Sequence, residues 1–559
     1  MSPQRYPARL HAQKLAVELG NLLSSEEKGC THAVLLQASP STCRDDTDRE
    51  MLFHQEANFN YLTGCLIPSA IVLLLFTFPE MSSLPPKIQH TLLIPPADPV
   101  ETMWSVAPPT LEEARAMYDS DSFQHTTALP QLLAAATSSS DGQSSTQVTI
   151  HTLPLTMEYP PLPHILDTLQ RSKIRTSAEH LLKALHIARL VKTESEIDLI
   201  REACRISSGA HEVLMMELGR YASLRAEKKI EKKARDGKEG VREWEVESEG
   251  DAEALFVASC RRQGAINMAY LPIVASGSRA STLHYVCNDR LFPSTSIPRQ
   301  AGDTSFSPQA PSRGCCGSAP EHEHASPTSE YHSAAFQPQL LLIDAGCEWK
   351  GYAADVTRTI PIGNGGKYTE RGREIYDLVL RMQKECEEIT VAGKHWDEIH
   401  LHAHKVLIEG FLKLGLFKGD KDAILQSGIS AAFYPHGLGH SLGLDVHDSR
   451  QYLKTTFLDL PESTAKTPSK LYAYLRIRQV LVENMVLTIE PGCYFAPQLL
   501  TEHGVYESEF VDQKVLESYE GIGGVRIEDV VVVKKGACEN LTTVGRDTAW
   551  VEKTCSGSD

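Results

Sequence analysis

The sequence predicts an α/β (α+β) protein of two domains, and three observations support this prediction. The chain has 559 residues, which is more than one domain usually holds. Its first 190 residues alternate helix-like and strand-like segments. Residues 191–559 hold short apolar segments in which single acidic residues recur. We therefore expect one domain over residues 1–190 and a second over residues 191–559.

The elements of the first domain are predicted from length and composition. Residues 7–19 are typical of a helix. The runs HAVLLQ at 32–37, AIVLLLF at 70–76 and HTLLIP at 90–95 are typical of strands. The longest purely apolar stretch, 70–76, is far too short to span a membrane. TSSSDGQSST at 137–146 predicts a surface loop.

The second domain is predicted to begin with a helix at Thr193. Thr193 and Glu196 have the spacing of a capping box, in which each side chain bonds to the backbone of the other residue. An apolar stripe follows on one face of this helix, made of Ile197, Ile200, Cys204 and Leu214. The stripe indicates that this face is buried.

Five short segments of the second domain each contain one residue that can bind a metal. The segments are IDAG at 343–346, ADVTRT at 354–359, HGLGH at 436–440, TIEPG at 488–492 and GGVRIED at 523–529. They contribute Asp344, Asp355, His440, Glu490 and Glu528. An unpaired carboxylate in an apolar strand is costly, so it must be paired, bound to metal or protonated. Two divalent ions would remove the repulsion among four converging carboxylates.

Local patterns place these residues at the ends of strands. Arg526 and Glu528 share one face of their strand, because side chains alternate. Asp344 ends one apolar run and Asp355 begins the next, so we expect them to face each other across a hairpin. The glycines of HGLGH favour a loop over a helix. Each segment alone also fits a structural role, and only their joint occurrence predicts a metal site.

The order and wording of the segments resemble the pita-bread metallopeptidase family (peptidase M24B). Within it they are similar to the prolidases and Xaa-Pro aminopeptidases of eukaryotic, fungal-like type. The resemblance extends to HSLGLDVHD at 440–448, VASGSRASTLHY at 274–285 and EPGCYF at 490–495, and more weakly to HQEANFNYLTG at 54–64. It implies a creatinase-type N-terminal α/β domain followed by a pita-bread metallopeptidase domain.

The resemblance also implies roles for single residues. The implied metal ligands are Asp344, Asp355, His440, Glu490 and Glu528, with Asp355 and Glu528 bridging. The residues implied to line the substrate site are His284, His436, His447 and Arg526. Glu490 would also act as general base, and His436 or His447 would donate to the oxyanion. Without the resemblance, His284 also fits a packed strand residue.

The expected cofactor is two Mn²⁺ per subunit, because an oxygen-rich ligand set suits hard or borderline ions, although Zn²⁺, Co²⁺ and Fe²⁺ also fit. The expected function is an aminopeptidase that releases the residue before a penultimate proline. One alternative is an Xaa-Pro dipeptidase, which must also grip a C-terminal carboxylate with an arginine such as Arg526 or Arg450. The other is a non-catalytic pita-bread protein that binds peptides or protein partners.

Composition restricts the partners and the compartment. The net charge of −17 argues against nucleic acid. The N-terminus lacks a signal-type apolar core, and thirteen scattered cysteines fit reduced thiols. We therefore expect a cytoplasmic protein without membrane association, and the resemblance implies a homo-oligomer, specifically a dimer.

Two segments depart from the family pattern. The charge run at 224–251 predicts a solvated helix extension or loop, with a basic patch for a partner as the alternative. Residues 291–337 are rich in Ser, Pro, Gly and His, cannot build a core, and are predicted to be a disordered insert. Within them, EHEH at 321–324 has a composition that binds stray metal.

Overall fold

The computed structural model describes residues 5–557 except 80–84, 138–146, 155, 157, 162–173, 228–244, 296–334 and 450–460. The described residues fall into two compact units, unit 1 (1–195) and unit 2 (196–559). The division follows Ser195, at the start of helix α6 (Glu194–Ala226), whereas the sequence places the boundary after residue 190. The predicted surface loop at 137–146 lies outside the described residues apart from its first residue.

Unit 1 is built on a mixed sheet. Within its described residues the sheet has six strands in the order β4-β3-β2-β1-β5-β6. The strands are β1 (Thr31–Gln37), β2 (Ile71–Thr77), β3 (Lys87–Ile94), β4 (Ser122–His125), β5 (Val148–His151) and β6 (Ile174–Ser177). The pairs β1–β2 and β2–β3 are antiparallel, and the remaining pairs are parallel. The strands predicted at 32–37, 70–76 and 90–95 are confirmed as β1, β2 and β3.

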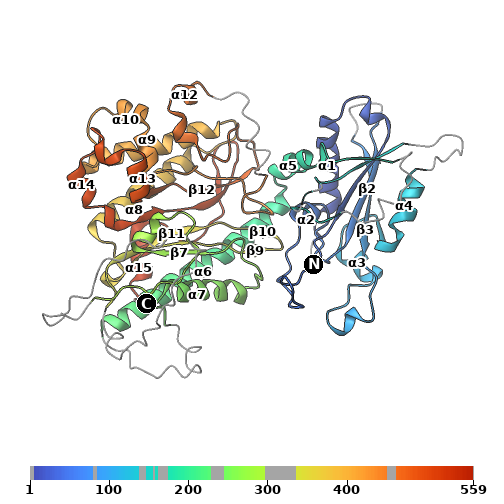
Figure 1. Ribbon diagram of the computed structural model, residues 1–559, viewed down its shortest axis with the longest axis horizontal. Helices are drawn as coiled ribbons and strands as arrows, with labels where there is room; N and C mark the ends of the chain where they lie inside the picture. The colour runs from blue at the N-terminus through green and yellow to red at the C-terminus, as the bar shows by residue number, and fades with distance from the viewer. Residues whose placement is uncertain are drawn as a thin grey trace. The chain divides into compact units, whose positions relative to one another are not determined.

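Helices cover both faces of this sheet. The helices of unit 1 are α1 (Ala8–Leu22), α2 (Ala57–Thr63), α3 (Leu111–Met117), α4 (Leu129–Ala136) and α5 (Leu181–Leu190). Leu129 and Leu133 of α4 pack in one cluster with Leu35, Leu73 and Ile150 of the sheet. Helix α1, which confirms the helix predicted at 7–19, lies on the opposite face (Figure 1). The α/β class of this unit therefore holds.

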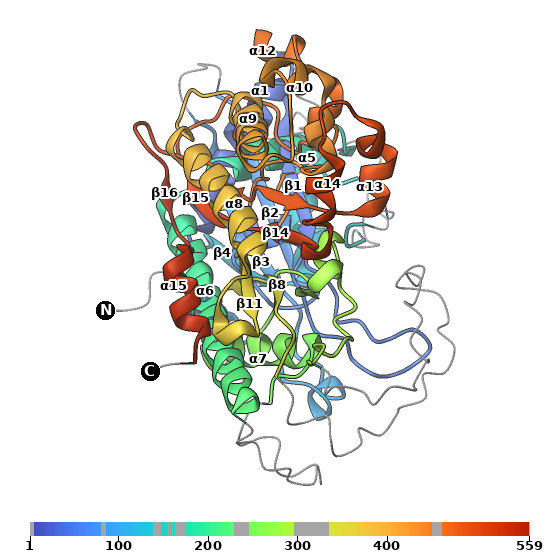
Figure 2. The ribbon, with the colours of Figure 1, turned by 90° about the vertical axis from the view of Figure 1, so that its left-hand side faces the viewer.

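The helices of unit 2 enclose its strands. They are α6, α7 (Glu249–Arg262), α8 (Glu370–Glu388), α9 (Trp396–Leu414), α10 (Lys421–Ser427), α12 (Glu462–Ala465), α13 (Pro497–Glu502), α14 (Gln513–Glu517) and α15 (Thr548–Cys555). The predicted apolar stripe of α6 is buried at all four positions. The C-terminal α15 lies beside α6, where Ser223 Oγ donates to the carbonyl of Ser556 at 3.1 Å (Figure 2). In the described part of the chain no helix has the length and apolar character needed to cross a bilayer.

The strands of unit 2 form several small sheets. They are β7 (Ile273–Ser276), β8 (Gln339–Asp344), β9 (Glu348–Trp349), β10 (Tyr352–Ala353), β11 (Thr357–Ile362), β12 (Val486–Ile489), β13 (Gly492–Tyr494), β14 (Gly524–Arg526), β15 (Asp529–Val532) and β16 (Glu539–Asn540). The sheets have the orders β11-β8-β7, β12-β15-β16, β13-β14 and β10-β9 in the described residues. Asp344 lies opposite Thr357 in the antiparallel β8–β11 pair, so the predicted hairpin is confirmed.

The predicted solvation of the charge run at 224–251 is wrong at both of its ends. The side chain of Arg225 is 4% exposed, and its Nη1 lies 2.6 Å from Oε1 of Glu247. Glu249, at the start of α7, is fully buried. These charges are buried because each has an opposite charge or several hydrogen-bond donors beside it. The middle of the run, 228–244, lies outside the described residues.

The prediction of disorder for residues 291–337 is likewise wrong at the two ends of this segment. Phe292 and Phe336 are buried, and their ring centroids lie 5.6 Å apart in an edge-to-face contact. Ser294 pairs with Phe336 in a short antiparallel bridge. Two aromatic residues are enough to bury the ends of a segment whose average composition is polar. Residues 296–334, including EHEH at 321–324, lie outside the described residues.

Candidate metal centre

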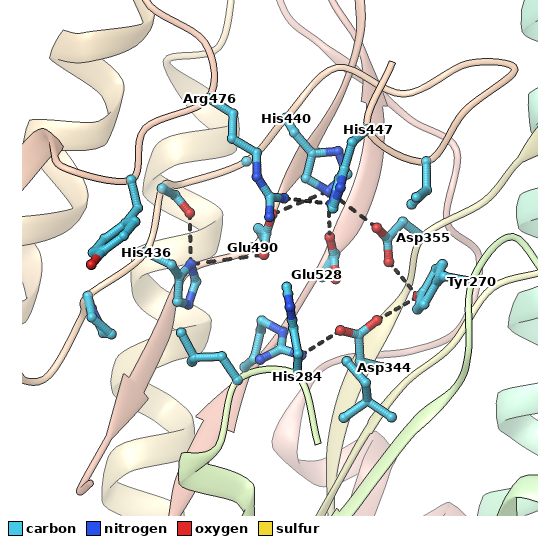
Figure 3. Close-up of a pocket in the computed structure, with 18 of the residues that line it drawn as sticks. Tyr270, His284, Asp344, Asp355, His436, His440, His447, Arg476, Glu490 and Glu528 are labelled. Carbon is cyan, nitrogen blue, oxygen red and sulfur yellow. Dashed lines mark hydrogen bonds and ion pairs between the residues drawn. The ribbon is translucent and has the colours of Figure 1, made fainter. Parts of the chain in front are cut away.

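The five residues predicted as metal ligands come together in one pocket of unit 2 (Figure 3). Asp344 is the last residue of β8, and Asp355 stands just before β11. Glu490 follows β12 directly, and Glu528 directly precedes β15. All four carboxylates are therefore placed by strand ends. The pocket has a volume of about 810 Å³.

A shared interruption in two paired strands places both glutamates at the pocket. Strand β12 pairs with β15, and β13 pairs with β14, so the ladder breaks between the two pairs. The break falls at Glu490–Pro491 on one side and Ile527–Glu528 on the other. Proline has no N–H to continue a ladder, which explains the interruption on its side. The two glutamates consequently leave the sheet at the same place.

The HGLGH segment is a loop, as predicted, and it runs along β12. The N–H of Thr488 donates to the carbonyl of His440 at 2.9 Å, and the N–H of Glu490 donates to the carbonyl of Leu438 at 2.8 Å. A Cβ atom on Gly439 would lie 2.0 Å from the carbonyl oxygen of Thr488. Only glycine permits this approach, so Gly439 is what allows His440 to reach the carboxylates.

His440 points its free nitrogen at the carboxylates. Its Nδ1 donates to the carbonyl of Ser441 at 3.2 Å, which leaves Nε2 as the unprotonated nitrogen of the neutral ring. Nε2 lies 3.3 Å from Oδ2 of Asp355, 3.4 Å from Oε1 of Glu490 and 4.0 Å from Oε1 of Glu528. Ligand atoms of Asp355, His440 and Glu528 all lie within 4.8 Å of one another.

Burial and mutual repulsion make this group hard to ionise by itself. Burial raises the pKa of Asp355 well above its usual range, and the carboxylate of Asp344 raises it further. Burial also raises the pKa of Glu528, with Asp355 as the second cause. Burial lowers the pKa of His440, so the imidazole is kept neutral. A divalent cation reverses the preference of the carboxylates, because it favours their ionised form, and it also favours the neutral imidazole.

One buried oxygen shows that the donor set fits a cation. Oε2 of Glu528 accepts from Thr357 Oγ1 at 2.7 Å. Its Oε1 is buried and has no hydrogen-bond partner among the described residues. A buried acceptor without a donor is costly unless a cation or other ligand satisfies it. Four carboxylates and one imidazole therefore fit one or two divalent ions.

Tyr270 is a site residue that the sequence did not reveal. Its hydroxyl lies 2.5 Å from Oδ1 of Asp344 and 2.5 Å from Oδ1 of Asp355. It stands shortly before β7, in the stretch AYLPIVAS, and no residue spacing marks it as functional. By touching both aspartates, Tyr270 fixes their separation.

A hydrogen-bonded chain connects Asp344 with His436. Arg526 Nη2 lies 2.5 Å from Oδ2 of Asp344, and Nη1 donates to the hydroxyl oxygen of Tyr494 at 2.9 Å. Tyr494 lies 2.8 Å from Nε2 of His436, whose Nδ1 lies 2.8 Å from the carbonyl of Gly437. A carbonyl only accepts, so Nδ1 carries the proton and Nε2 accepts from Tyr494. Burial lowers the pKa of His436 to about 3, so this ring is neutral.

The other predicted histidines also line the pocket. The ring of His447 packs edge-to-face on that of His440 at 4.4 Å, and Arg476 Nη1 donates to its Nε2 at 2.6 Å. His284 is exposed in a turn, so the alternative of a packed strand residue is wrong. Arg476 is a second pocket residue that the sequence did not reveal, because its segment has no metal-ligand pattern. Arg450 lies outside the described residues.

Family models match both units. The model of metallopeptidase family M24 matches residues 198–535, and that of the aminopeptidase P N-terminal domain matches residues 11–144. The chain is 33% identical over 557 residues to the protein named Probable Xaa-Pro aminopeptidase PEPP of Podospora anserina, covering 99% of this chain and 98% of that protein. It is 33% identical over 551 residues to a probable Xaa-Pro aminopeptidase of Aspergillus fumigatus, covering 98% and 97%.

Solved structures share the fold. Aminopeptidase PepP of Pseudomonas aeruginosa aligns with a TM-score of 0.65 at 25% identity, over 99% of this chain and 98% of that chain. Aminopeptidase P of E. coli with the inhibitor Pro-Leu aligns with a TM-score of 0.67 at 23% identity, over 99% of both chains. The similarity therefore extends over both units of the chain.

Proposed function

Because this chain belongs to metallopeptidase family M24 and carries an aminopeptidase P N-terminal domain, we propose that it is a metal-dependent Xaa-Pro aminopeptidase. It would release the N-terminal residue that precedes a penultimate proline. The observation that carries this proposal is the convergence of Asp344, Asp355, Glu490 and Glu528 on His440 in one pocket. The names of the relatives from Podospora and Aspergillus support the substrate class.

Two Mn²⁺ per subunit are our proposed cofactors, with Zn²⁺, Co²⁺ and Fe²⁺ as further candidates, because oxygen ligands dominate the site. The holding residues would be Asp344, Asp355, His440, Glu490 and Glu528. Such a pair of ions would lower the pKa of bound water towards neutrality and so supply the nucleophile. The protein residues then position the substrate and carry its protons.

Glu490 is the proposed proton carrier. It lies in the pocket beside His436 and His440, where its carboxylate can accept a proton from the attacking water. Its Oε2 lies 3.9 Å from Nδ1 of His436. The proton of His436 on Nδ1 is directed to the carbonyl of Gly437, and Nε2 of His447 accepts from Arg476. His436 or His447 would stabilise the oxyanion. His284 would contact the substrate from the exposed side of the pocket.

Peptide hydrolysis with a chelator control tests this proposal. The protein, supplied with Mn²⁺, is incubated with Gly-Pro and with a longer Xaa-Pro-Xaa peptide. We expect release of the first residue from the longer peptide and loss of activity on chelation. Cleavage of Gly-Pro alone would favour a dipeptidase. Failure to cleave either peptide would favour a non-catalytic binding protein.

One observation favours the dipeptidase as second candidate. A dipeptidase must bind the C-terminal carboxylate of its substrate, and Arg476 reaches into the pocket (Figure 3). Arg526 is already engaged by Asp344 and Tyr494. Substituting Arg476→Gln distinguishes the candidates: a dipeptidase loses Gly-Pro cleavage far more than tripeptide cleavage, whereas an aminopeptidase loses both similarly.

We also propose a homodimer in the cytoplasm. Unit 1 exposes Met103 (70%), Trp104 (81%) and Val106 (97%) close together in sequence, which suits an interface with a second copy. Light scattering of the wild type and Trp104→Ser tests it, and a monomeric wild type would exclude it. The cytoplasmic location rests on the scattered cysteines of the sequence, and fractionation of cells tests it.

A further inference from the structure

Large apolar side chains that are exposed to solvent surround the mouth of the pocket. Leu271 is 72% exposed, Tyr474 is 71% exposed and Val286 is 39% exposed, and all three line the pocket. We call these three residues the apolar rim. Single exposed apolar residues are ordinary on a protein surface, but several around one pocket mark a binding surface.

Each residue of the apolar rim stands close in sequence to a residue of the pocket floor. Leu271 follows Tyr270, which bonds to Asp344 and Asp355. Val286 is on the same segment as His284, and Tyr474 is on the same segment as Arg476. The rim is therefore continuous with the floor, and a ligand bound at the metal ligands reaches the rim as it leaves the pocket.

The direction of the substrate follows from the reaction. An aminopeptidase cleaves the first peptide bond, so the N-terminal residue and the proline must occupy the floor, at the metal ligands. The rest of the peptide leaves through the mouth. The volume of about 810 Å³ is near the upper end of the range of small-molecule sites, roughly 300–1,000 Å³, and suits a ligand longer than two residues.

We propose that the apolar rim is a subsite for the side chain of the residue after proline, and that it selects peptides with an apolar or aromatic residue there. This inference rests on the proposed function. Burial of an apolar side chain against Leu271, Val286 and Tyr474 removes both surfaces from water. A small polar residue gains nothing there, and an acidic residue would be favoured only if Arg476 governed the choice.

The test compares four amidated tripeptides: Ala-Pro-Leu, Ala-Pro-Phe, Ala-Pro-Ser and Ala-Pro-Asp. The amide removes the C-terminal carboxylate, so that Arg476 cannot bind it. With the Mn²⁺-loaded full chain we expect kcat/KM for the Leu and Phe peptides to exceed that for the Ser peptide about tenfold. In Leu271→Ser and Tyr474→Ser this ratio should fall to about twofold, mainly through KM. Both residues are exposed, so these substitutions leave the core intact.

Met216→Ser is the matched control. Met216 is 56% exposed on α6 and does not line the pocket, so this variant should keep the wild-type ratio. Equal rates on all four peptides, or an unchanged ratio in both rim variants, would overturn the inference and leave the aminopeptidase proposal standing. Preference for the Asp peptide would overturn it in favour of Arg476. Cleavage of none of the peptides would instead overturn the proposed function.

Discussion

His32 and His151 in unit 1 are as buried as His440 in unit 2, but their nitrogens meet different atoms. His32 and His151 stand on the neighbouring strands β1 and β5, and Nδ1 of His32 lies 2.9 Å from Nε2 of His151. His440 faces oxygens of three carboxylates within 4.0 Å. Burial lowers the pKa of all three rings, so their charge state does not distinguish them. The atoms that each ring contacts do distinguish them.

The difference comes from how the strands end. In unit 1 the strands β1 and β2 pair continuously, and their buried side chains, such as Leu35 and Leu73, form an apolar cluster. In unit 2 the ladder breaks at Glu490–Pro491, and acids occupy the break. A binding site thus arises where a sheet is interrupted, and a buried histidine alone does not make one.

The largest expected effect comes from removing one of the carboxylates that face His440 in unit 2. Glu528→Ala should reduce kcat/KM by more than about a thousandfold, because it removes a carboxylate that we propose to bind both metals. The fold should largely survive, since of the two deleted oxygens only Oε2 has a hydrogen-bond partner among the described residues, the hydroxyl of Thr357. Activity and metal content measured on the same sample check this.

Asp529→Asn is the matched control for Glu528→Ala. Asp529 is the next residue, but its Oδ1 faces Nη2 of the buried Arg358 at 2.7 Å and does not line the pocket. Its loss should lower the melting temperature and leave metal content unchanged, because it unpairs a buried charge. Normal turnover by Glu528→Ala would refute the two-metal site.

The second prediction concerns the chain between Arg526 and His436. Tyr494→Phe removes the donor to Nε2 of His436 and the acceptor of Arg526 Nη1. Loss of a residue that hydrogen-bonds to a functional side chain typically costs about 10- to 100-fold in activity or metal affinity. We therefore expect kcat to decrease by about 10- to 100-fold. Stopped assays over pH 5–9 measure kcat and show whether its pH profile also changes.

Tyr519→Phe is the control for Tyr494→Phe. Its hydroxyl is bonded to Glu374 at 2.6 Å, and it does not line the pocket. This variant should retain its kcat. If Tyr494→Phe were as active as Tyr519→Phe, the chain from Asp344 to His436 would have no part in catalysis.

The third prediction concerns Glu249, a buried carboxylate of unit 2 that is stabilised by hydrogen-bond donors of the protein and needs no metal. Glu249 accepts from the N–H and Oγ of Ser276, from Arg279, from the hydroxyl of Tyr285 and from the N–H of Arg290. It thereby anchors both ends of the segment that carries His284. Glu249→Gln replaces one acceptor oxygen by a donor, so the segment loosens. We expect KM to rise about tenfold with little change in metal content.

Glu253→Gln is the control for Glu249→Gln. Glu253 stands on the same helix, α7, and its Oε2 accepts from Asn288 at 2.8 Å. Among the described residues it contacts the far end of the segment through one hydrogen bond, so its KM effect should be smaller. Equal KM values for both variants would show that Glu249 has no special part in placing His284.

A sequence pattern reveals a functional residue when the residues next to it in the sequence belong to the same pattern. Asp344 and Glu490 were predictable because each interrupts an apolar strand, and the strand periodicity is local. Tyr270 and Arg476 were not, because they reach the pocket only through the tertiary fold. The prediction of disorder for residues 291–337 likewise rested on their average composition. It missed Phe292 and Phe336, which are buried at the ends of that polar segment.

The same limit applies to buried charge. The run at 224–251 is polar throughout, and nothing local shows that Arg225 pairs with Glu247 across residues 228–244. The apolar stripe of α6 was predictable because helix periodicity places its residues on one face. Elements set by local periodicity were therefore predicted correctly, whereas the contacts of Arg225, Tyr270 and Arg476, which distant residues set, were missed.

The smallest expected effect concerns the buried histidine pair of unit 1 and the pH dependence of stability. Burial lowers the pKa of His151 from 6.5 to about 4. As pH falls through 6.5 the unfolded chain binds a proton that the folded protein does not, so stability falls between pH 6.5 and 4. At pH 5.5 the loss from this residue is about 1.4 kcal/mol. His151→Gln keeps a partner for His32 and removes the titration, so its urea midpoint should fall less than that of the wild type between pH 7.5 and 5.5. Equal losses would mean that His151 is not kept neutral by burial, and the shared neutrality of the two histidine sites would no longer hold.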